Sequence, residues 1–300
     1  MPIPFTVIGG FLGAGKTTLM NRVLREAGGV RYAVLVNDFG ALNIDAELIA
    51  EHGGETVALA NGCICCSIGD SLVETLVELM SRPDPADHIL VEASGVANPA
   101  RIADVAVIDP ALSLDGTVVL VDAEAIAAQV EDKLIGETVC QQLNAADILV
   151  CNKSDLTSPD EQHAVLKLLD NLAPGIPVVV ASQADIPLDA VLGQGGPRKE
   201  AGHANPYPHH DDRFHRAEVV SGEPPRRAAF EAALDGLPSS VLRGKGFVRF
   251  AEEPERTYLL HLVGRRWSLA PSEAVDAACC RLVFIGTAEM PVSGLPGSGQ

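Results

Sequence analysis

A glycine-rich segment near the start of the chain carries residues suited to binding phosphate. Gly10, Gly15, Lys16 and Thr17 fit the spacing G-x-x-x-x-G-K-[ST], after an apolar run and at the start of a helical pattern. Such glycines let backbone N–H groups turn toward phosphate oxygens at the positive end of a helix. We therefore predict that Lys16 contacts the β- and γ-phosphates and that Thr17 is a ligand of Mg²⁺. The other residues expected to contact the nucleotide here are Gly13, Ala14 and Thr18.

A carboxylate follows a later apolar run. Glu92 ends "HILVE", and Gly95 comes three residues after it. We expect Glu92 to hold Mg²⁺ through water and to act with Lys16 in catalysis, while the Gly95 amide senses the γ-phosphate. The alternative is an ordinary solvent-facing glutamate at a strand end.

The segment "NKSD" predicts which base is bound. Asn152, Lys153 and Asp155 form N-K-x-D directly after the apolar run "DILVC". The Asp155 carboxylate can accept hydrogen bonds from guanine N1–H and its amino group, whereas adenine has no N1–H. The Lys153 stem can lie along the ring, Asn152 can brace the loop, and Ser182 is a further candidate contact. GTP is therefore the expected nucleotide. Asp122, at another strand end, receives no chemical role.

The residue after Gly95 bears on the rate of hydrolysis. Fast GTPases use a side chain that orients the attacking water, often Gln, and Val96 stands in that position. Since valine cannot polarise water, we predict slow intrinsic hydrolysis.

Three cysteines are crowded into "NGCICCS". Cys63, Cys65 and Cys66 lie between the phosphate motif and Glu92, where nucleotide-responsive segments are expected. They could pack in the core, or Cys63 and Cys66 could form a redox pair. We favour a metal site, because thiolates prefer Zn²⁺ and other borderline or soft ions. Three adjacent thiols leave the shell incomplete, which suits delivery, and Asp38 is the nearest candidate carboxylate.

The elements that must position these residues follow from the apolar runs. Runs without polar alternation indicate strands of a parallel sheet covered on both faces, and amphipathic stretches lie between them. We therefore predict an α/β fold for residues 1–191, a doubly wound, mostly parallel sheet forming a P-loop GTPase domain.

Beyond residue 191 the composition and the hydrophobic pattern of the sequence change. Residues 192–212 are rich in Gly, Pro, His and charge and are predicted to be a linker, followed by a smaller α+β domain at 213–289 and a disordered tail at 290–300. The linker region offers histidines that either gather metal or are simply solvated; they are His203, His209, His210 and His215.

Composition excludes several classes of protein. A formal net charge of −18 argues against a nucleic-acid or anionic membrane surface, and no run approaches a membrane-spanning length. The N-terminus lacks a secretory pattern, and seven cysteines are an odd number for a disulfide framework. We expect a cytoplasmic protein.

Taken together, these motifs resemble the CobW-like family of P-loop GTPases, relatives of the urease and hydrogenase maturation GTPases. The segments that carry the resemblance are "GGFLGAGKTTLMNRVL", "VNDFGALNIDAELI", "NGCICCS", "ILVEASGVANPARI" and "NKSDL", with "GKGFVRFAE", "RRWSLAP" and "RLVFIG" similar to the C-terminal domain of the family.

The resemblance implies GTP-dependent metal handling. It assigns the transferred metal, zinc or cobalt, to Cys63, Cys65 and Cys66, and delivery to a metalloprotein client; a homodimer is also expected. Asp38 stands where the family usually has Glu. We therefore expect a metallochaperone that hydrolyses GTP slowly. The alternatives are a P-loop ATPase or kinase with structural zinc, and a non-hydrolytic sensor of metal and nucleotide.

Overall fold

The chain divides into two compact units in a computed structural model that describes residues 2–27, 29–36, 55–58, 70–193, 214–272 and 278–287. Residues 55–58, 70 and 71 are described by their backbone alone. The first unit contains nearly all described residues up to 188, and the second contains those from 214 onward. Each unit is described by itself below.

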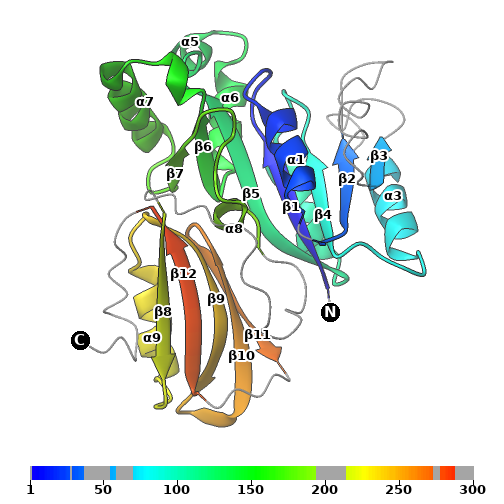
Figure 1. Cartoon of the computed structure of the whole chain (residues 1–300), viewed down its shortest axis with the longest axis vertical. Coiled ribbons are helices and arrows are strands. Elements are labelled where there is room, and N and C mark those ends of the chain that lie inside the picture. The colour runs from blue at the N-terminus through cyan, green and yellow to red at the C-terminus, as the bar shows by residue number, and fades with distance from the viewer. Residues whose placement is uncertain are drawn as a thin grey trace. The chain divides into compact units, whose positions relative to one another are not determined.

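The first unit is built on a parallel sheet. Within the described residues it has seven strands in the order β3-β2-β4-β1-β5-β6-β7, and every adjacent pair is parallel (Figure 1). The strands are β1 (Ile3–Gly9), β2 (Tyr32–Val36), β3 (Glu55–Ala58), β4 (His88–Glu92), β5 (Leu112–Asp122), β6 (Ile148–Asn152) and β7 (Val178–Val180). Because these strands are parallel, their carboxyl ends share one edge of the sheet.

The central strands are buried on both faces, as the unbroken apolar runs predicted. All five residues of β4 and all five of β6 are buried. The predicted doubly wound α/β fold is therefore confirmed. One irregularity interrupts the pairing of β1 with β5, where the register shifts between Phe5 and Thr6 and skips Asp115.

Helices connect the strands. They are α1 (Lys16–Arg25), α3 (Asp70–Met80), α4 (Pro99–Ile108), α5 (Ile126–Glu131), α6 (Gly136–Asn144), the 3₁₀ turn η1 (Ser154–Leu156) and α7 (Pro159–Leu172), and the short helix α8 (Leu188–Val191) follows the last strand in the chain of this unit. Helix α7 begins with a capping box, in which Ser158 and Glu161 satisfy each other's backbone N–H groups. Leu72 and Leu76 of α3 and Ile102 of α4 join one core cluster with Phe5 and Val91 of the sheet.

The second unit is an antiparallel sheet with a helix on it. In the described residues the strand order is β11-β10-β9-β12-β8. The elements are β8 (His215–Ser221), α9 (Arg227–Asp235), β9 (Val241–Phe250), β10 (Glu253–Val263), β11 (Arg266–Ser272) and β12 (Cys280–Gly286). Phe230 of α9 packs against Phe250, with ring centroids 5.6 Å apart. The predicted second α+β unit is thus confirmed.

No helix among the residues described is both long and apolar enough to cross a membrane.

Candidate functional site

The phosphate loop (residues 10–17) leaves β1 and enters α1 through glycines that no other residue could replace. Gly10 has φ 129° and Gly15 has φ 103°, both in the region that disfavours side chains. A Cβ at Gly10 would lie 2.3 Å from Leu120 O, and one at Gly15 would lie 2.4 Å from Asn152 Nδ2. The loop backbone is therefore held directly against the ends of β5 and β6, in the conformation that a phosphate cradle requires.

Lys16 begins helix α1 and bends back over the loop. Its side chain is buried, with the residue 8% exposed, and Nζ donates a 3.0 Å hydrogen bond to Gly10 O. Among the described residues no side chain caps the N-terminus of α1, and its first turn has no acidic residue. This end of the helix thus keeps its positive field for an anion. Thr17 is half-buried beside it, and Thr18 is exposed.

Glu92 lies at the end of β4, next to the strand that leads into the phosphate loop. Its Cα pairs with Ile8 in the register of β1 and β4, and Ala93 N donates to Ile8 O at 2.8 Å. Glu92 is only 4% exposed, so the alternative of a solvent-facing glutamate is wrong. A buried carboxylate in this position fits a site for a divalent cation, because carboxylate oxygens are among the ligands that Mg²⁺ uses in nucleotide sites.

The β4 loop (residues 93–98) follows Glu92 and touches the phosphate loop. A Cβ at Gly95 would lie 2.4 Å from Leu12 Cδ2 and 3.0 Å from Leu12 N, so the absence of a side chain lets the two loops approach closely. Among described atoms, the buried Ser94 Oγ has no hydrogen-bond partner. An unsatisfied hydroxyl between Glu92 and Gly95 agrees with a site built to receive a polar ligand.

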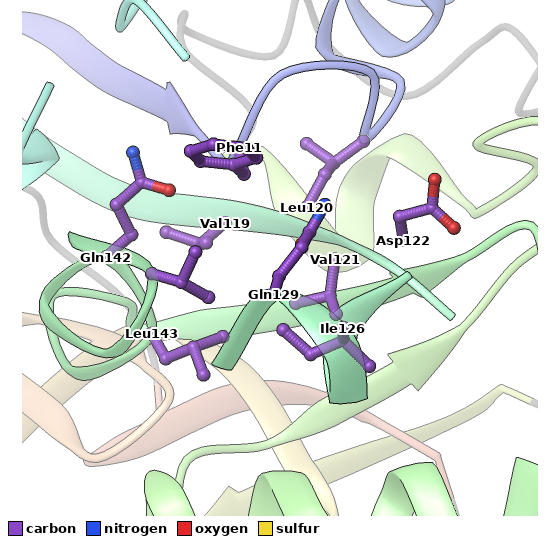
Figure 2. Close-up of a pocket in the computed structure, with 10 residues that line it drawn as sticks. Phe11, Val119, Leu120, Val121, Asp122, Ile126, Gln129, Gln142 and Leu143 are labelled. Carbon is purple, nitrogen blue, oxygen red and sulfur yellow. The ribbon is translucent and has the colours of Figure 1, made fainter. Parts of the chain in front are cut away.

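The β4 loop is held from behind by Gln142, a residue that sequence reasoning missed. This side chain of α6 is 2% exposed, and Nε2 donates to Gly95 O at 3.1 Å and to Ala97 O at 2.9 Å. Figure 2 shows Gln142 and Phe11 together at one side of a pocket beneath the phosphate loop, with Asp122 at the other side. A glutamine in an amphipathic helix gives no motif, so no signal in the sequence could have found it.

Asn152, at the end of β6, joins the phosphate loop to the base loop (residues 152–155). It is 1% exposed. Its Nδ2 donates to Ala14 O at 2.9 Å, and its Oδ1 accepts from Ala184 N at 2.8 Å. A single amide therefore connects the loop after β1, the loop after β6 and the loop after β7.

Lys153 is held by the carboxylate of Asp122, a residue for which the sequence predicted no role. Lys153 has left-handed backbone angles, φ 61° and ψ 30°, and Nζ donates to Asp122 Oδ2 at 2.6 Å. Asp122 ends β5 and pairs with Asn152 in the register of β5 and β6. The sequence shows Asp122 at the end of an apolar run, but its pairing with Lys153 depends on strand order and register, which the sequence does not display.

The remaining residues predicted to contact the base lie at the same edge of the sheet. Ser154 Oγ and Ser182 Oγ are 3.0 Å apart, within hydrogen-bond distance. Asp155 is exposed in the turn η1, which leaves its carboxylate accessible to a ligand. Two loops that follow adjacent strands therefore present a hydroxyl pair and a carboxylate together.

The predicted metal site lies outside the described residues. These residues are Asp38, Cys63, Cys65 and Cys66, and the same holds for His203, His209 and His210. His215 is described and is exposed at the start of β8. The parts of the chain that the structure describes contain no group of three or more His, Cys, Asp or Glu side chains that could hold a metal ion.

Cys151 lies beside the base loop but is not poised for chemistry. It is fully buried in β6. Burial, and secondarily the nearby Asp122 carboxylate, raises the pKa of its thiol to about 11. The thiol therefore stays protonated at neutral pH and acts as a packing group.

Two family models match this chain. Residues 4–180 match the CobW/HypB/UreG nucleotide-binding domain, and residues 214–293 match the cobalamin synthesis protein cobW C-terminal domain. The chain belongs to the CobW/HypB/UreG family, as the motifs suggested.

Curated relatives agree with this placement. The chain is 33% identical to the zinc chaperone CobW of Sinorhizobium sp, with 96% of this chain and 94% of that protein covered. It is 33% identical to the zinc chaperone YjiA of Escherichia coli over 65% of this chain and 62% of that protein. It is 37% identical to the zinc-regulated GTPase metalloprotein activator 1 of Schizosaccharomyces pombe, over 55% of this chain and 42% of that protein.

Proposed function

We propose that this chain is a GTP-dependent metallochaperone, which binds zinc or cobalt at its C-x-C-C segment, delivers the ion to a metalloprotein client in the cytoplasm and hydrolyses GTP slowly. One observation carries the nucleotide part of this proposal. The hydrogen bonds of the Asn152 side chain with Ala14 and Ala184 hold the phosphate cradle and the N-K-x-D loop next to each other. Family membership and the zinc-related names of the relatives support the metal part.

In this proposal the phosphate end of the nucleotide is bound mainly by backbone. The N–H groups of the phosphate loop and the start of α1 face the phosphate oxygens, and Lys16 exchanges its bond to Gly10 O for the β- and γ-phosphates. Thr17 and Glu92 would hold Mg²⁺, which when bound neutralises charge that builds up on the phosphates. The burial of Glu92 and the unsatisfied Ser94 Oγ support this assignment.

The base end supplies the selection between nucleotides. Asp155 accepts hydrogen bonds from guanine N1–H and its amino group, and adenine leaves this carboxylate unsatisfied. Lys153 lies along the ring, and Ser182 adds a polar contact through the loop after β7. The exposure of Asp155 and the 3.0 Å contact between Ser154 and Ser182 support these roles.

In this proposal hydrolysis is slow because the residue that follows Gly95, where fast GTPases often have a water-orienting glutamine, cannot polarise water. Val96 occupies that position and is 37% exposed. A homodimer, a client or bound metal is then required to complete the site, and acceleration by that partner couples hydrolysis to delivery.

The metal is cargo, and its site is Cys63, Cys65 and Cys66, with Asp38 as a candidate fourth ligand. In chain order Asp38 follows β2, and the three cysteines come between β3 and α3. GTP binding and metal binding must then affect each other equally, because coupling free energies are reciprocal.

The proposal is tested by titrating Zn²⁺ into the full chain with a non-hydrolysable GTP analogue and Mg²⁺, and separately with GDP. We expect at least about a fivefold difference in zinc affinity, the lower end of typical coupling. Lys16→Ala should remove the difference, and replacing the three cysteines by serine should remove tight zinc binding while GTP binding persists. Equal zinc affinity in the two nucleotide states, or ATP turnover exceeding GTP turnover, would contradict the proposal.

A further inference from the structure

We propose that Asp122 is a specificity-determining residue of the guanine site, which acts by positioning Lys153. This inference rests on the proposed function, because it assigns the base loop to guanine. Asp122 itself does not touch the base and is a positioning residue.

Both oxygens of the Asp122 carboxylate are occupied. Oδ2 accepts from Lys153 Nζ at 2.6 Å, and Oδ1 accepts from Glu124 N at 3.1 Å. The Asp122 side chain is 10% exposed and the Lys153 side chain is 33% exposed. A carboxylate held at both oxygens and mostly buried has little rotational freedom, so the ammonium group that it binds is fixed as well.

The backbone of the two residues is also joined. Ala123 N donates to Asn152 O at 2.9 Å, which continues the pairing of β5 with β6 past Asp122. Lys153 then turns into left-handed backbone angles. With its Cα fixed by this turn and its Nζ fixed by Asp122, the four-carbon stem of Lys153 spans a defined path and presents an apolar edge to a ring.

Without Asp122 the ammonium group of Lys153 could instead pair with Asp155, which would impair base binding. Asp155 lies two residues after Lys153 and carries the carboxylate that reads guanine. A mobile lysine would be drawn to this exposed carboxylate and would compete with the guanine N–H groups for its oxygens. Asp122 therefore has two effects: it shapes the face that stacks on the base, and it keeps Lys153 away from Asp155.

This arrangement predicts that removing the Asp122 charge weakens the binding of the base and leaves the binding of the phosphates unchanged. Asp122→Asn keeps the size of the side chain but removes the charge that binds Nζ. Affinity for GDP should fall about tenfold, whereas the phosphate cradle, formed by residues 10–17, should be unaffected. Inorganic tripolyphosphate probes the cradle alone, because it has no base.

The experiment is calorimetric titration of GDP and of inorganic tripolyphosphate into the full chain, with Mg²⁺ present. Asp122→Asn should weaken GDP about tenfold and leave tripolyphosphate unchanged, and Asp122→Glu, which retains a carboxylate for Lys153, should recover part of the loss. The matched control is Glu124→Gln, which removes one negative charge from an exposed side chain two residues away and should change neither titration.

A second variant separates positioning from folding. Lys153→Met keeps most of the stem but has no ammonium group for Asp122 to hold. If Asp122 acts only through Lys153, the double variant Asp122→Asn with Lys153→Met should bind GDP no more weakly than whichever single variant binds it less tightly. Unchanged GDP affinity in Asp122→Asn, or an equal loss for GDP and tripolyphosphate, would overturn the inference. If the unaltered chain binds tripolyphosphate but does not distinguish GDP from ADP, the guanine assignment itself fails, and this inference fails with it.

Discussion

Asn152 Nδ2 lies 2.9 Å from Ala14 O, across 138 positions of the sequence, and donates a hydrogen bond to it. The same side chain accepts from Ala184 N. The phosphate loop and the base loop are therefore not structurally independent, because one buried amide connects their backbones.

Replacing this amide should damage stability and binding together. Asn152→Ala leaves Ala14 O and Ala184 N without their partner, and each buried unsatisfied group costs about 1–3 kcal/mol. We expect a fall of at least about 2 kcal/mol in the free energy of unfolding, measured by urea denaturation. The control is Asn144→Ala, which removes an exposed bond to Cys140 O and should change stability by less than about 0.5 kcal/mol. Similar losses in the two variants would contradict the bridging role.

Gln142 should affect the discrimination between GTP and GDP rather than the discrimination between guanine and other bases. Gln142→Leu removes the donors to Gly95 O and Ala97 O, so the β4 loop loses its support at Gly95, the residue that we propose contacts the γ-phosphate. We expect the ratio of GTP to GDP affinity to move toward one and kcat to fall. Gln141→Leu alters the neighbouring exposed side chain, whose bond is to Glu137, and should change neither quantity. The readout is paired titration of GDP and a non-hydrolysable GTP analogue.

Substitution of Asp155 should change the base preference of the site from guanine to xanthine. Xanthine carries a carbonyl where guanine has its amino group, so an amide donor suits it and a carboxylate repels it. Asp155→Asn should therefore lower GTP affinity and raise XTP affinity, with a reversal of preference measured by competition. A variant that loses GTP binding without gaining XTP would place the base recognition elsewhere.

Cys151 should be inert in the folded chain. With a pKa of about 11, roughly a thousandth of this thiol is ionised at pH 8, and the residue is fully buried. Labelling with a thiol reagent at pH 8, followed by peptide mapping, should modify the half-buried Cys140 before Cys151. In urea both should react. Fast labelling of Cys151 in the native chain would show that β6 opens readily.

The parts of the site that were predictable are those encoded locally. The phosphate loop and the base loop each need their residues at fixed short spacings, so the sequence alone displays them. The strands were also predictable, because a sheet covered on both faces requires unbroken apolar runs such as β4 and β6. Helix α7 lies on one of the amphipathic stretches that separate these runs.

The residues that were missed act across long separations. Asp122 meets Lys153 from 31 positions away, and Gln142 meets Gly95 from 47 positions away. These pairs depend on strand register and on the rotation of α6 about its axis, neither of which has a local pattern. Glu92 stays a predicted magnesium ligand, and the sequence left open whether its side chain faces solvent, because the 4% exposure of this residue depends on tertiary packing.

Gly15 also limits how this protein can be re-engineered and how it can vary. Because a methyl group at this position would collide with the amide of Asn152, the glycine is required by the contact with the base loop as well as by its own left-handed backbone. A chimaera that imported a different base loop would place new atoms against the same backbone. The two loops must therefore be exchanged as a pair, and base preference in this chain cannot be transplanted as a separate module.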